Sequence, residues 1–437
     1  MVRFRPFRGW RYNPDVVGDV ASVLCPPYDM IGREMLESLA QQSPYNAVHL
    51  EGAEQPDWQQ PAGQRYAQAA DLFQEWRGLE VLRRDPEPAF YLLRHSFLHQ
   101  GQTRTRLAIF GCVGLEEYEQ RQVLPHEFTR AAAVQDRVSL METGGANFSP
   151  IMSLYRDNAG SLKPLLAEVM AGPPVLDAPD TWGQQSTLWQ IDQIGHQETI
   201  SRLFDDRQIF LADGHHRYEA ALQLRRKQLQ VQNSAGQAPA GEERAGDYVM
   251  MALIEFDDPG LMLLPYHRVI GGLPPAKLAD LRRRLDELFE SQPVESGPDN
   301  NHEALLDRVA QWSGEQKVMG LVGPRGEGDS LLTLRQHVDW RDWGPLAAAE
   351  SWILEEQVLK PVLGASIEEH VSYPHEHQAA LDQVASGDRQ MVFLLKPFPM
   401  DHFESIVATG QRLPSKSTFF FPKLPTGLVI NQLEGTL

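Results

Sequence analysis

A short run of chemically active side chains follows an apolar stretch near the middle of the chain. After the apolar residues 209–212, the sequence reads Asp213-Gly214-His215-His216-Arg217. An apolar run that passes through a glycine into an Ala- and Leu-rich stretch predicts a buried strand, a turn and a helix start. Free N–H groups at a helix start favour an anion, and an arginine can bind phosphate through two parallel hydrogen bonds. The pattern therefore predicts a phosphate site, to which the histidines add donors or proton carriers. The alternative is that Asp213 only caps the helix and the histidines lie on the surface.

A second polar cluster lies between residues 123 and 150. It consists of Val123-Leu124-Pro125-His126-Glu127-Phe128-Thr129, Gln135-Asp136-Arg137 and Gly144-Gly145-Ala146-Asn147-Phe148-Ser149-Pro150. Glu127 is a candidate general base, because burial can raise the pKa of a carboxyl group towards neutrality. Asp136 and Arg137 can equally form a surface ion pair of little energetic value.

Two further segments carry weaker signals. Lys416, Ser417 and Thr418 resemble the end of a phosphate loop, but the upstream glycines are absent, so they are expected only as anion contacts from a neighbouring element. The histidine-rich stretch 370–377 invites a metal-site interpretation. Its spacing does not match a helical zinc motif and a proline interrupts it, so a solvated loop is the preferred interpretation.

Composition limits the classes of function. The 437 residues are 42% hydrophobic and carry a net charge of −19, which disfavours nonspecific binding to nucleic acid. Two cysteines, Cys25 and Cys112, are too few for a disulfide framework. No stretch approaches the roughly 18 apolar residues of a membrane span, and the N-terminal residues lack the apolar core of a signal peptide. We therefore expect a cytoplasmic protein without membrane or nucleic-acid partners.

Periodicity predicts an α+β protein. Helices are expected over 66–79, 162–170 and 218–228, a hairpin over 89–99 and 103–113, strands over 188–191, 209–212 and 248–255, and a loop over 231–246. A new pattern follows the glycines at 271–272. Its expected helices cover 275–291, 301–312, 347–362 and 400–408, and its strands 317–322, 330–335 and 390–395. The predicted domains are therefore 1–272 and 273–437.

Motifs along almost the whole chain resemble those of the DUF1015 family. They are Pro6-Phe7-Arg8-Gly9, Pro26-Pro27-Tyr28-Asp29, Ser43-Pro44-Tyr45-Asn46, Leu124-Pro125-His126-Glu127, Asp136-Arg137, Ala146-Asn147, Ser149-Pro150, 212–218, Lys416-Ser417-Thr418 and Pro422-Lys423. Two positions depart from the family pattern. Phe128 stands where a basic residue is usual, and Gln135 stands where a lysine is expected nearby.

The resemblance implies a fold and an activity. The family is placed with ParB/sulfiredoxin-like proteins, so the N-terminal part is expected to hold that α/β core and the rest an additional α+β region. The segment 213–217 is similar to the phosphate-binding boxes of those proteins, and closer still to that of archaeal free-serine kinases. This implies a phosphotransferase that uses ATP or ADP with Mg²⁺ and acts on a small hydroxyl compound, free L-serine first.

The expected site residues follow from this hypothesis. Nucleotide phosphates would be bound by Gly214, His215, Arg217, Lys416, Ser417 and Thr418. Catalysis would use Glu127 as the base together with Asp213, which also binds the metal, and His216. The substrate would contact His126, Thr129, Arg137, Asn147 and Ser149.

Three other functions stay open at this point: a ParB-like nucleotide switch, a metal-dependent hydrolase that uses the histidines, and a noncatalytic scaffold. Assembly into homodimers is also left open.

Overall fold

The computed structural model describes residues 1–52, 62–179, 183–234, 243–295, 302–323, 328–414 and 416–437. The chain divides into two compact units. Unit 1 contains Met1–Leu261 together with Pro422–Leu437, and unit 2 contains Met262–Phe421. The sequence had suggested two continuous domains that meet near residue 272. In the structure the boundary along the chain lies eleven residues earlier, between residues 261 and 262. The segment Pro422–Leu437 belongs to unit 1.

Unit 1 is built on a mixed sheet. Within the described residues the sheet has nine strands in the order β6-β11-β8-β12-β5-β4-β10-β9, with β1 paired to β5. The pairs β6–β11 and β8–β12 are parallel and the others are antiparallel. The strands of this unit are β1 (Phe4–Arg5), β2 (Trp10–Tyr12), β3 (Leu82–Arg84), β4 (Phe90–His99), β5 (Gln102–Gly114), β6 (Val123–Leu124), β7 (Ala146–Asn147), β8 (Ile151–Tyr155), β9 (Leu176–Pro179), β10 (Gln185–Ile191), β11 (Ile209–Asp213), β12 (Tyr248–Glu255) and β21 (Asn431–Gln432).

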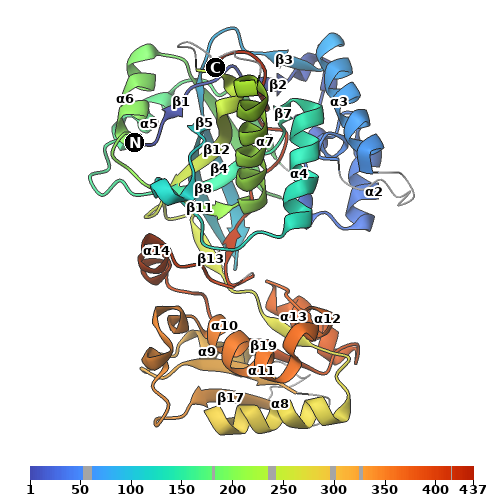
Figure 1. Ribbon diagram of the computed structural model, residues 1–437, viewed down its shortest axis with the longest axis vertical. Coiled ribbons are helices and arrows are strands. Elements are labelled where there is room, and N and C mark those ends of the chain that lie inside the picture. The colour runs from blue at the N-terminus through green and yellow to red at the C-terminus, as the bar shows by residue number, and fades with distance from the viewer. Residues whose placement is uncertain (53–61, 180–182, 235–242, 296–301, 324–327, 415) are drawn as a thin grey trace. The chain divides into compact units, whose positions relative to one another are not determined.

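Helices pack beside this sheet, and α7, α4 and α3 form a row in which each contacts the next (Figure 1). The α-helices of unit 1 are α1 (Pro14–Val17), α2 (Arg33–Gln42), α3 (Ala62–Gly78), α4 (Ala131–Gly144), α5 (Lys163–Ala171), α6 (Ile194–Phe204) and α7 (His215–Ser234). Short 3-10 helices are η1 (Val20–Val23), η2 (Tyr28–Met30), η3 (Ala47–His49), η4 (Tyr118–Gln120) and η5 (Ala245–Asp247).

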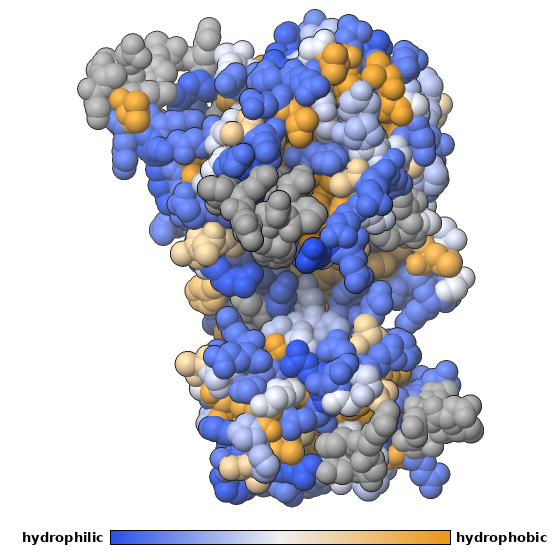
Figure 2. Space-filling model, turned by 90° about the vertical axis from the view of Figure 1, so that its right-hand side faces the viewer, coloured by the Kyte–Doolittle hydropathy of each residue, from blue (hydrophilic) through white to orange (hydrophobic). Residues whose placement is uncertain are grey.

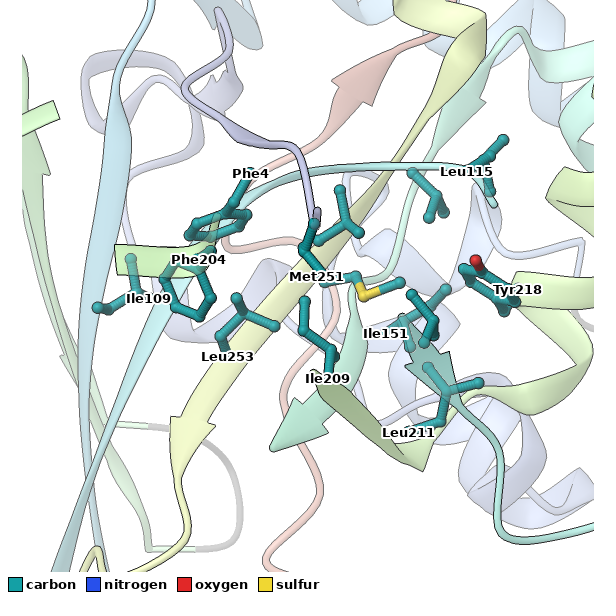
Figure 3. Packing of buried hydrophobic residues seen from close by; sticks show 14 of the residues in the cluster. Phe4, Ile109, Leu115, Ile151, Phe204, Ile209, Leu211, Tyr218, Met251 and Leu253 are labelled. Atoms are coloured by element: carbon teal, nitrogen blue, oxygen red, sulfur yellow. The ribbon is translucent and has the colours of Figure 1, made fainter. Parts of the chain in front are cut away.

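The main core of unit 1 lies between the sheet and its helices. Met251 of β12 and Ile151 of β8 pack together with Leu211 of β11 and with Tyr218, which is in the second turn of α7 (Figure 3). Tyr218 is completely buried, and its hydroxyl donates to the carbonyl of Glu116 at 2.8 Å. These contacts fix the strand β11 and the start of α7 relative to each other, because both ends of the junction between them are anchored in the core.

The C-terminal segment of unit 1 is held by backbone pairing with four distant parts of the chain. Thr426 pairs with Cys25, Ile430 with Trp10, Thr436 with Arg244, and β21 with β7. The segment also buries Leu428, Val429 and Ile430. It is therefore an integral part of unit 1.

Unit 2 is a second α+β unit. Its described strands form a six-stranded antiparallel sheet in the order β15-β17-β16-β19-β14-β18 and a separate pair β13–β20. The strands are β13 (Met262–Leu264), β14 (Arg268–Ile270), β15 (Phe289–Val294), β16 (Val318–Val322), β17 (Asp329–Leu334), β18 (Val371–Ser372), β19 (Met391–Leu394) and β20 (Phe419–Phe421). The helices are α8 (Pro275–Leu288), α9 (Glu303–Ala310), η7 (Trp340–Trp343), η8 (Pro345–Ala348), α10 (Glu350–Trp352), the π-helix η9 (Ile353–Leu359), α11 (Lys360–Leu363), η10 (Gly364–Ser366), α12 (Ile367–His370), α13 (His377–Ala385) and α14 (Met400–Ala408).

The predicted α+β class is confirmed, and several elements match closely. The helix α3 and the hairpin β4–β5 lie where the sequence predicts them, and the strand β12 has the predicted bounds. Three of the predicted helices differ. The helix α7 starts at His215 rather than 218 and continues to Ser234, into the predicted loop; the rest of that loop up to 242 is outside the described residues. The predicted helix over 275–291 ends at Leu288 and becomes β15, and the one over 347–362 is divided into α10, η9 and α11.

The visible face of the molecule is mostly hydrophilic, and its hydrophobic residues are scattered over it (Figure 2). Among the described residues, no helix is both long enough and apolar enough to cross a membrane.

Candidate functional site

The predicted phosphate junction is a tight turn between β11 and α7. The pairing of β11 with β8 shifts register between Leu211 and Asp213, so the strand ends in an irregularity. Gly214 follows with φ +93°, a conformation that costs free energy for a residue with a side chain. A Cβ atom at Gly214 would also lie 2.9 Å from Nε of Arg217. The glycine therefore permits both the turn and the close approach of the arginine.

Arg217 is buried at this junction, with 4% of the residue exposed. Its Nη1 donates to the carbonyl of Pro150 at 2.5 Å, and its Nη2 donates to Oδ2 of Asp213 at 2.6 Å. Its Nε is buried without a hydrogen-bond partner among the described residues. Burial alone would lower the pKa of Arg217, but the carboxylates of Asp213 and Asp29 raise it above its ordinary value. A buried, charged guanidinium with an unused donor at a helix N-terminus is suited to an anion.

Asp213 lies between two cations. Oδ2 contacts Arg217, and Oδ1 forms an ion pair with Nζ of Lys423 from the C-terminal segment. Burial would raise the pKa of Asp213, but the charges of Lys423 and Arg217 outweigh it and hold the pKa well below its usual value. Asp213 is therefore a carboxylate at neutral pH.

The three histidines of the site connect its segments. Nε2 of His215 accepts a hydrogen bond from the backbone N–H of His126 at 3.2 Å, and Nε2 of His216 accepts one from Arg130 at 3.1 Å. Nδ1 of His126 lies 2.6 Å from the carbonyl of Leu211. Burial lowers the pKa of His215 to about 3, with a further contribution from His126. His215 is therefore neutral at physiological pH, and both histidines of α7 act as acceptors through Nε2.

These contacts bring the loop after β6 to the start of α7. Glu127 Oε1 lies 3.6 Å from Nε2 of His126, and its side chain is 22% exposed. The charges of both Glu127 and Asp213 act on the pKa of His215, so the two predicted catalytic carboxylates lie around one imidazole. Thr129 is half-buried in the same loop, whereas Phe128 is 62% exposed. The predicted clusters thus meet, although their chemical roles stay predictions.

A third segment, around Tyr28, reaches the same region. The guanidinium of Arg137, on α4, lies 3.9 Å from the ring centroid of Tyr28. Asp29 is exposed, and its charge helps to raise the pKa of Arg217. The pKa of His216 is lowered, mainly by burial, and the charge of Asp29 opposes that shift. The pKa of Tyr28 is raised to about 12, mainly by burial. The motif 26–29 therefore places an exposed carboxylate near the phosphate junction.

Arg137 belongs to a buried ion-pair network. It donates to the carboxylate and the carbonyl of Glu51, each at 3.1 Å, and to Asp136 at 2.7 Å. Asp136 in turn accepts from Arg65 and from the hydroxyl of Tyr66. Glu51 is 1% exposed, and its Oε1 is buried without a hydrogen-bond partner among the described residues. The surface-pair alternative for Asp136 and Arg137 is therefore wrong, because Arg137 is buried against Glu51.

Asn147 ends the strand β7, and Ser149 follows it two residues later. Asn147 Oδ1 accepts from the N–H of Met250 at 3.0 Å and from Nδ2 of Asn431 at 3.1 Å. Its own Nδ2 is buried without a partner in the described part of the chain. Ser149 is buried directly before Pro150, whose carbonyl accepts from Arg217. Asn147 thus has a structural role at β7, and substrate binding by either residue stays a prediction.

The predicted phosphate contacts Lys416, Ser417 and Thr418 belong to unit 2. Lys416 has φ +62°, and its Nζ lies 5.2 Å from the ring centroid of Tyr266. Ser417 Oγ donates to the carbonyl of Pro414 at 2.7 Å, and Ser417 and Thr418 are both buried. Their proposed part in nucleotide binding stays a prediction.

The side chains that the structure describes do not offer an evident cage for a metal ion. Neither at the junction nor in the histidine-rich stretch 370–377 do three described His, Cys, Asp or Glu residues gather as metal ligands. Both oxygens of Asp213 are already in contact with cations. This donor set does not fit a protein-held Mg²⁺, and Asp213 is not a metal ligand in this arrangement.

Sequence reasoning missed roles for Lys423 and Glu51. Lys423 was noted as part of a family motif, but only the return of the C-terminal segment to unit 1 brings it to Asp213. Glu51 carries no local signal at all. Asp29 was also noted only as part of a motif, and its charge near Arg217 is a tertiary feature.

The comparison with protein families identifies the chain. Residues 4–352 match the family described as "Protein of unknown function (DUF1015)". The chain therefore belongs to the DUF1015 family. The motifs at 416–418 and 422–423 lie beyond the matched range. No curated protein matches the chain.

Solved structures align with the chain at low similarity. A free serine kinase variant in complex with AMP has 12% identity and a TM-score of 0.38, covering 75% of this chain and 92% of its own. A free serine kinase variant with ADP has 13% identity and a TM-score of 0.37, covering 76% and 93%. SbnI from Staphylococcus aureus, truncated at its C-terminus, has 11% identity and a TM-score of 0.36, covering 75% and 87%. At these scores they carry no argument about this protein.

Proposed function

We propose that this protein is a nucleotide-dependent phosphotransferase whose acceptor is a small hydroxyl metabolite, with free L-serine as the first candidate. One observation carries the proposal. Arg217 is buried at the N-terminus of α7, and its Nε has no partner among the described residues. The charge of the exposed carboxylate Asp29 acts on the pKa of this arginine. Phosphoryl transfer needs this combination, because it depends on positioned positive charge for the phosphates and on an acceptor for one proton.

The phosphate end of the site is formed by Gly214, Arg217 and the start of α7. The helix N-terminus carries a partial positive charge, and Gly214 lets a phosphate oxygen approach the backbone. Nε of Arg217 is a donor that no described residue uses. His215 is held neutral by burial, so it contributes a donor at Nδ1 rather than a charge. In our proposal these groups bind the phosphates of ATP or ADP.

The chemical step is a direct transfer. The acceptor hydroxyl oxygen attacks the terminal phosphorus, a new P–O bond forms, and the bond between that phosphorus and the bridging oxygen breaks. ATP then leaves as ADP, or ADP as AMP, and the hydroxyl proton passes to a carboxylate. Mg²⁺ enters this scheme with the nucleotide, as part of the MgATP or MgADP substrate.

Two carboxylates are candidates for the base. Glu127, predicted from the sequence, lies beside His126. Asp29 is exposed, and its charge acts on both Arg217 and His216. The isosteric variants E127Q and D29N distinguish them, because general-base removal typically costs about 10²- to 10⁴-fold in rate. We expect one variant to lose turnover while it keeps nucleotide affinity. Full activity of E127Q would end the assignment made from the sequence.

The acceptor end is proposed to involve Arg137, whose guanidinium can pair with a carboxylate such as that of an amino acid. The other residues that we propose for substrate binding come from the same stretch of sequence and are His126, Thr129, Asn147 and Ser149. Arg137 is already paired with Glu51 and Asp136, so it can only share its donors with a substrate.

The deciding experiment measures ADP or AMP formation from MgATP or MgADP with and without L-serine, in the wild type and in R217A. Turnover that depends on serine and is lost in R217A supports a small-molecule kinase. Other amino acids and hydroxyl compounds then establish the preferred acceptor. Nucleotide hydrolysis that is indifferent to every acceptor would instead favour a nucleotide switch without a small substrate.

A further inference from the structure

The ion pair between Lys423 and Asp213 is the least expected contact of the candidate site. Asp213 comes from the end of β11 and Lys423 from the C-terminal segment, 210 residues later. The side chains of Lys423 and Asp213 are only 9% and 12% exposed. The desolvation cost of burying two charges offsets most of their attraction, so such a pair adds little net stability compared with an apolar contact.

The C-terminal segment does not need this ion pair to stay in place. Backbone pairing at Thr426, at Ile430 and in β21 already attaches it to unit 1, and its apolar residues 428–430 are buried. The chain therefore places a desolvated ammonium beside Asp213 on a backbone that is fixed by other interactions. A fixed backbone limits the positions that Nζ can reach.

The surroundings of Asp213 favour an anion. Its carboxylate oxygens contact Lys423 and Arg217, and it lies two residues before His215, the first residue of the 20-residue helix α7. Nε of Arg217, in a residue that is 4% exposed, lies beside Gly214 without a partner among the described residues. Two cations and a helix N-terminus thus surround one carboxylate, and one buried donor is unused.

We infer that Lys423 is a phosphate-binding residue, held on Asp213 in the ligand-free protein and shared with a nucleotide phosphate when one binds. A lysine ammonium is a compact charge with three donors, so one Nζ can bridge a carboxylate and a phosphate oxygen. In this role Asp213 positions Lys423 and keeps the charge balanced while the site is empty. The inference rests on the proposed function, and it adds a residue outside the range that matches the family.

Calorimetric titrations of adenosine, AMP and ADP test the inference in the full-length protein. The measured quantity is the ratio of ADP affinity to adenosine affinity, which isolates the phosphate contribution. Loss of a hydrogen bond to a charged group corresponds to about 10- to 100-fold in affinity, so we expect K423M to lower this ratio by that factor and to leave adenosine affinity unchanged. K423R should recover part of the ratio, since it retains the charge.

Two further variants separate this role from a structural one. The double variant D213N/K423M removes both charges of the pair, and it should fold even where K423M is unstable, yet still show the reduced ratio. K317M is the matched control from unit 2, because Lys317 is 11% exposed and pairs with the buried Glu350. K317M should lower the melting temperature without changing the ratio.

The outcomes are distinguishable. If the wild type binds ADP but K423M and D213N/K423M keep the wild-type ratio, Lys423 is a structural residue and the inference is wrong, while the proposed function stands. If the wild type binds neither ADP nor ATP, the proposed function fails and the inference fails with it.

Discussion

Each unit of this protein buries an arginine against a carboxylate, and the two pairs differ in what surrounds them. Arg217 of unit 1 pairs with Asp213 at a strand–helix junction, where its guanidinium lies beside Gly214. Arg268 of unit 2 is completely buried at the start of the strand β14. It donates to the carbonyls of Tyr266 and Lys416, at 2.8 and 3.0 Å, and lies 3.4 Å from Glu355.

The groups that surround each buried arginine indicate its role. Arg268 is enclosed by carbonyl oxygens, by Glu355 and by the ring of Tyr373, 4.8 Å from its guanidinium, so it cross-links its own unit. Arg217 stands next to Gly214 at the N-terminus of α7, a position whose free backbone N–H groups favour an anion. Arg268 therefore has a structural role, whereas a binding role for Arg217 is part of the proposed function.

The largest expected effect is on the stability of unit 2. Removing one partner of a buried ion pair typically costs about 3–5 kcal/mol, because the other charge is left buried and unpaired. R268A or E355A should lower the free energy of unfolding by this amount in chemical denaturation. The double variant R268M/E355L should recover most of it. A single variant as stable as the wild type would contradict the structural role of Arg268.

The second effect is on catalysis by unit 1. R217A should reduce nucleotide-dependent turnover by about 100-fold or more, the range typical for loss of a charge-stabilising donor. The control is the folded double variant R268M/E355L, which should keep the wild-type turnover per folded molecule. If R217A and R268M/E355L lost turnover equally, the two arginines would not differ in function.

The third effect is a pH dependence that both units should share. Burial lowers the pKa of His215, in unit 1, and of His267, in unit 2, to about 3 each. Because the unfolded histidine has a pKa near 6.5, the unfolded state binds more protons between about pH 6.5 and 3. Stability is therefore fully present above about pH 6.5 and is lost as the pH falls towards 3, by up to about 1.4 kcal/mol per pH unit for each histidine. H215N and H267N should each flatten the curve of unfolding free energy against pH. An unchanged slope in either variant would mean that this histidine is charged in the folded protein.

The smallest effect concerns two glycines with nearly equal φ angles. Gly214 has φ +93° and Gly344 of unit 2 has φ +90°, and alanine at either position costs about 1–3 kcal/mol in strain. A Cβ at Gly344 meets no atom within 4 Å, whereas one at Gly214 meets the guanidinium of Arg217. G214A should therefore lose nucleotide affinity as well as stability, and G344A only stability. Unchanged nucleotide affinity in G214A would show that Arg217 does not bind at this position.

The sequence predicted local elements well where one periodicity dominated. The aromatic and alanine positions of α3 and the alternation in the hairpin β4–β5 identified both elements. The prediction failed where the secondary structure changes within a segment whose residue pattern is continuous. The strand β15 follows α8 without an intervening turn, and the π-helix η9 divides a run with continuous helical periodicity. In both cases the packing of the run against its neighbours decided the outcome.

The sequence by itself determined the family, the α+β class and the Asp-Gly-His-His-Arg junction, because these depend on residue types that are adjacent in the chain. Only the tertiary structure decided which distant residues complete that junction. His126 reaches His215, Pro150 accepts from Arg217, and Lys423 pairs with Asp213 through contacts that local patterns do not encode. The physical reason is that a charged side chain can be buried only next to groups that pair or hydrogen-bond with it. The fold of the whole unit decides which distant segments supply those groups.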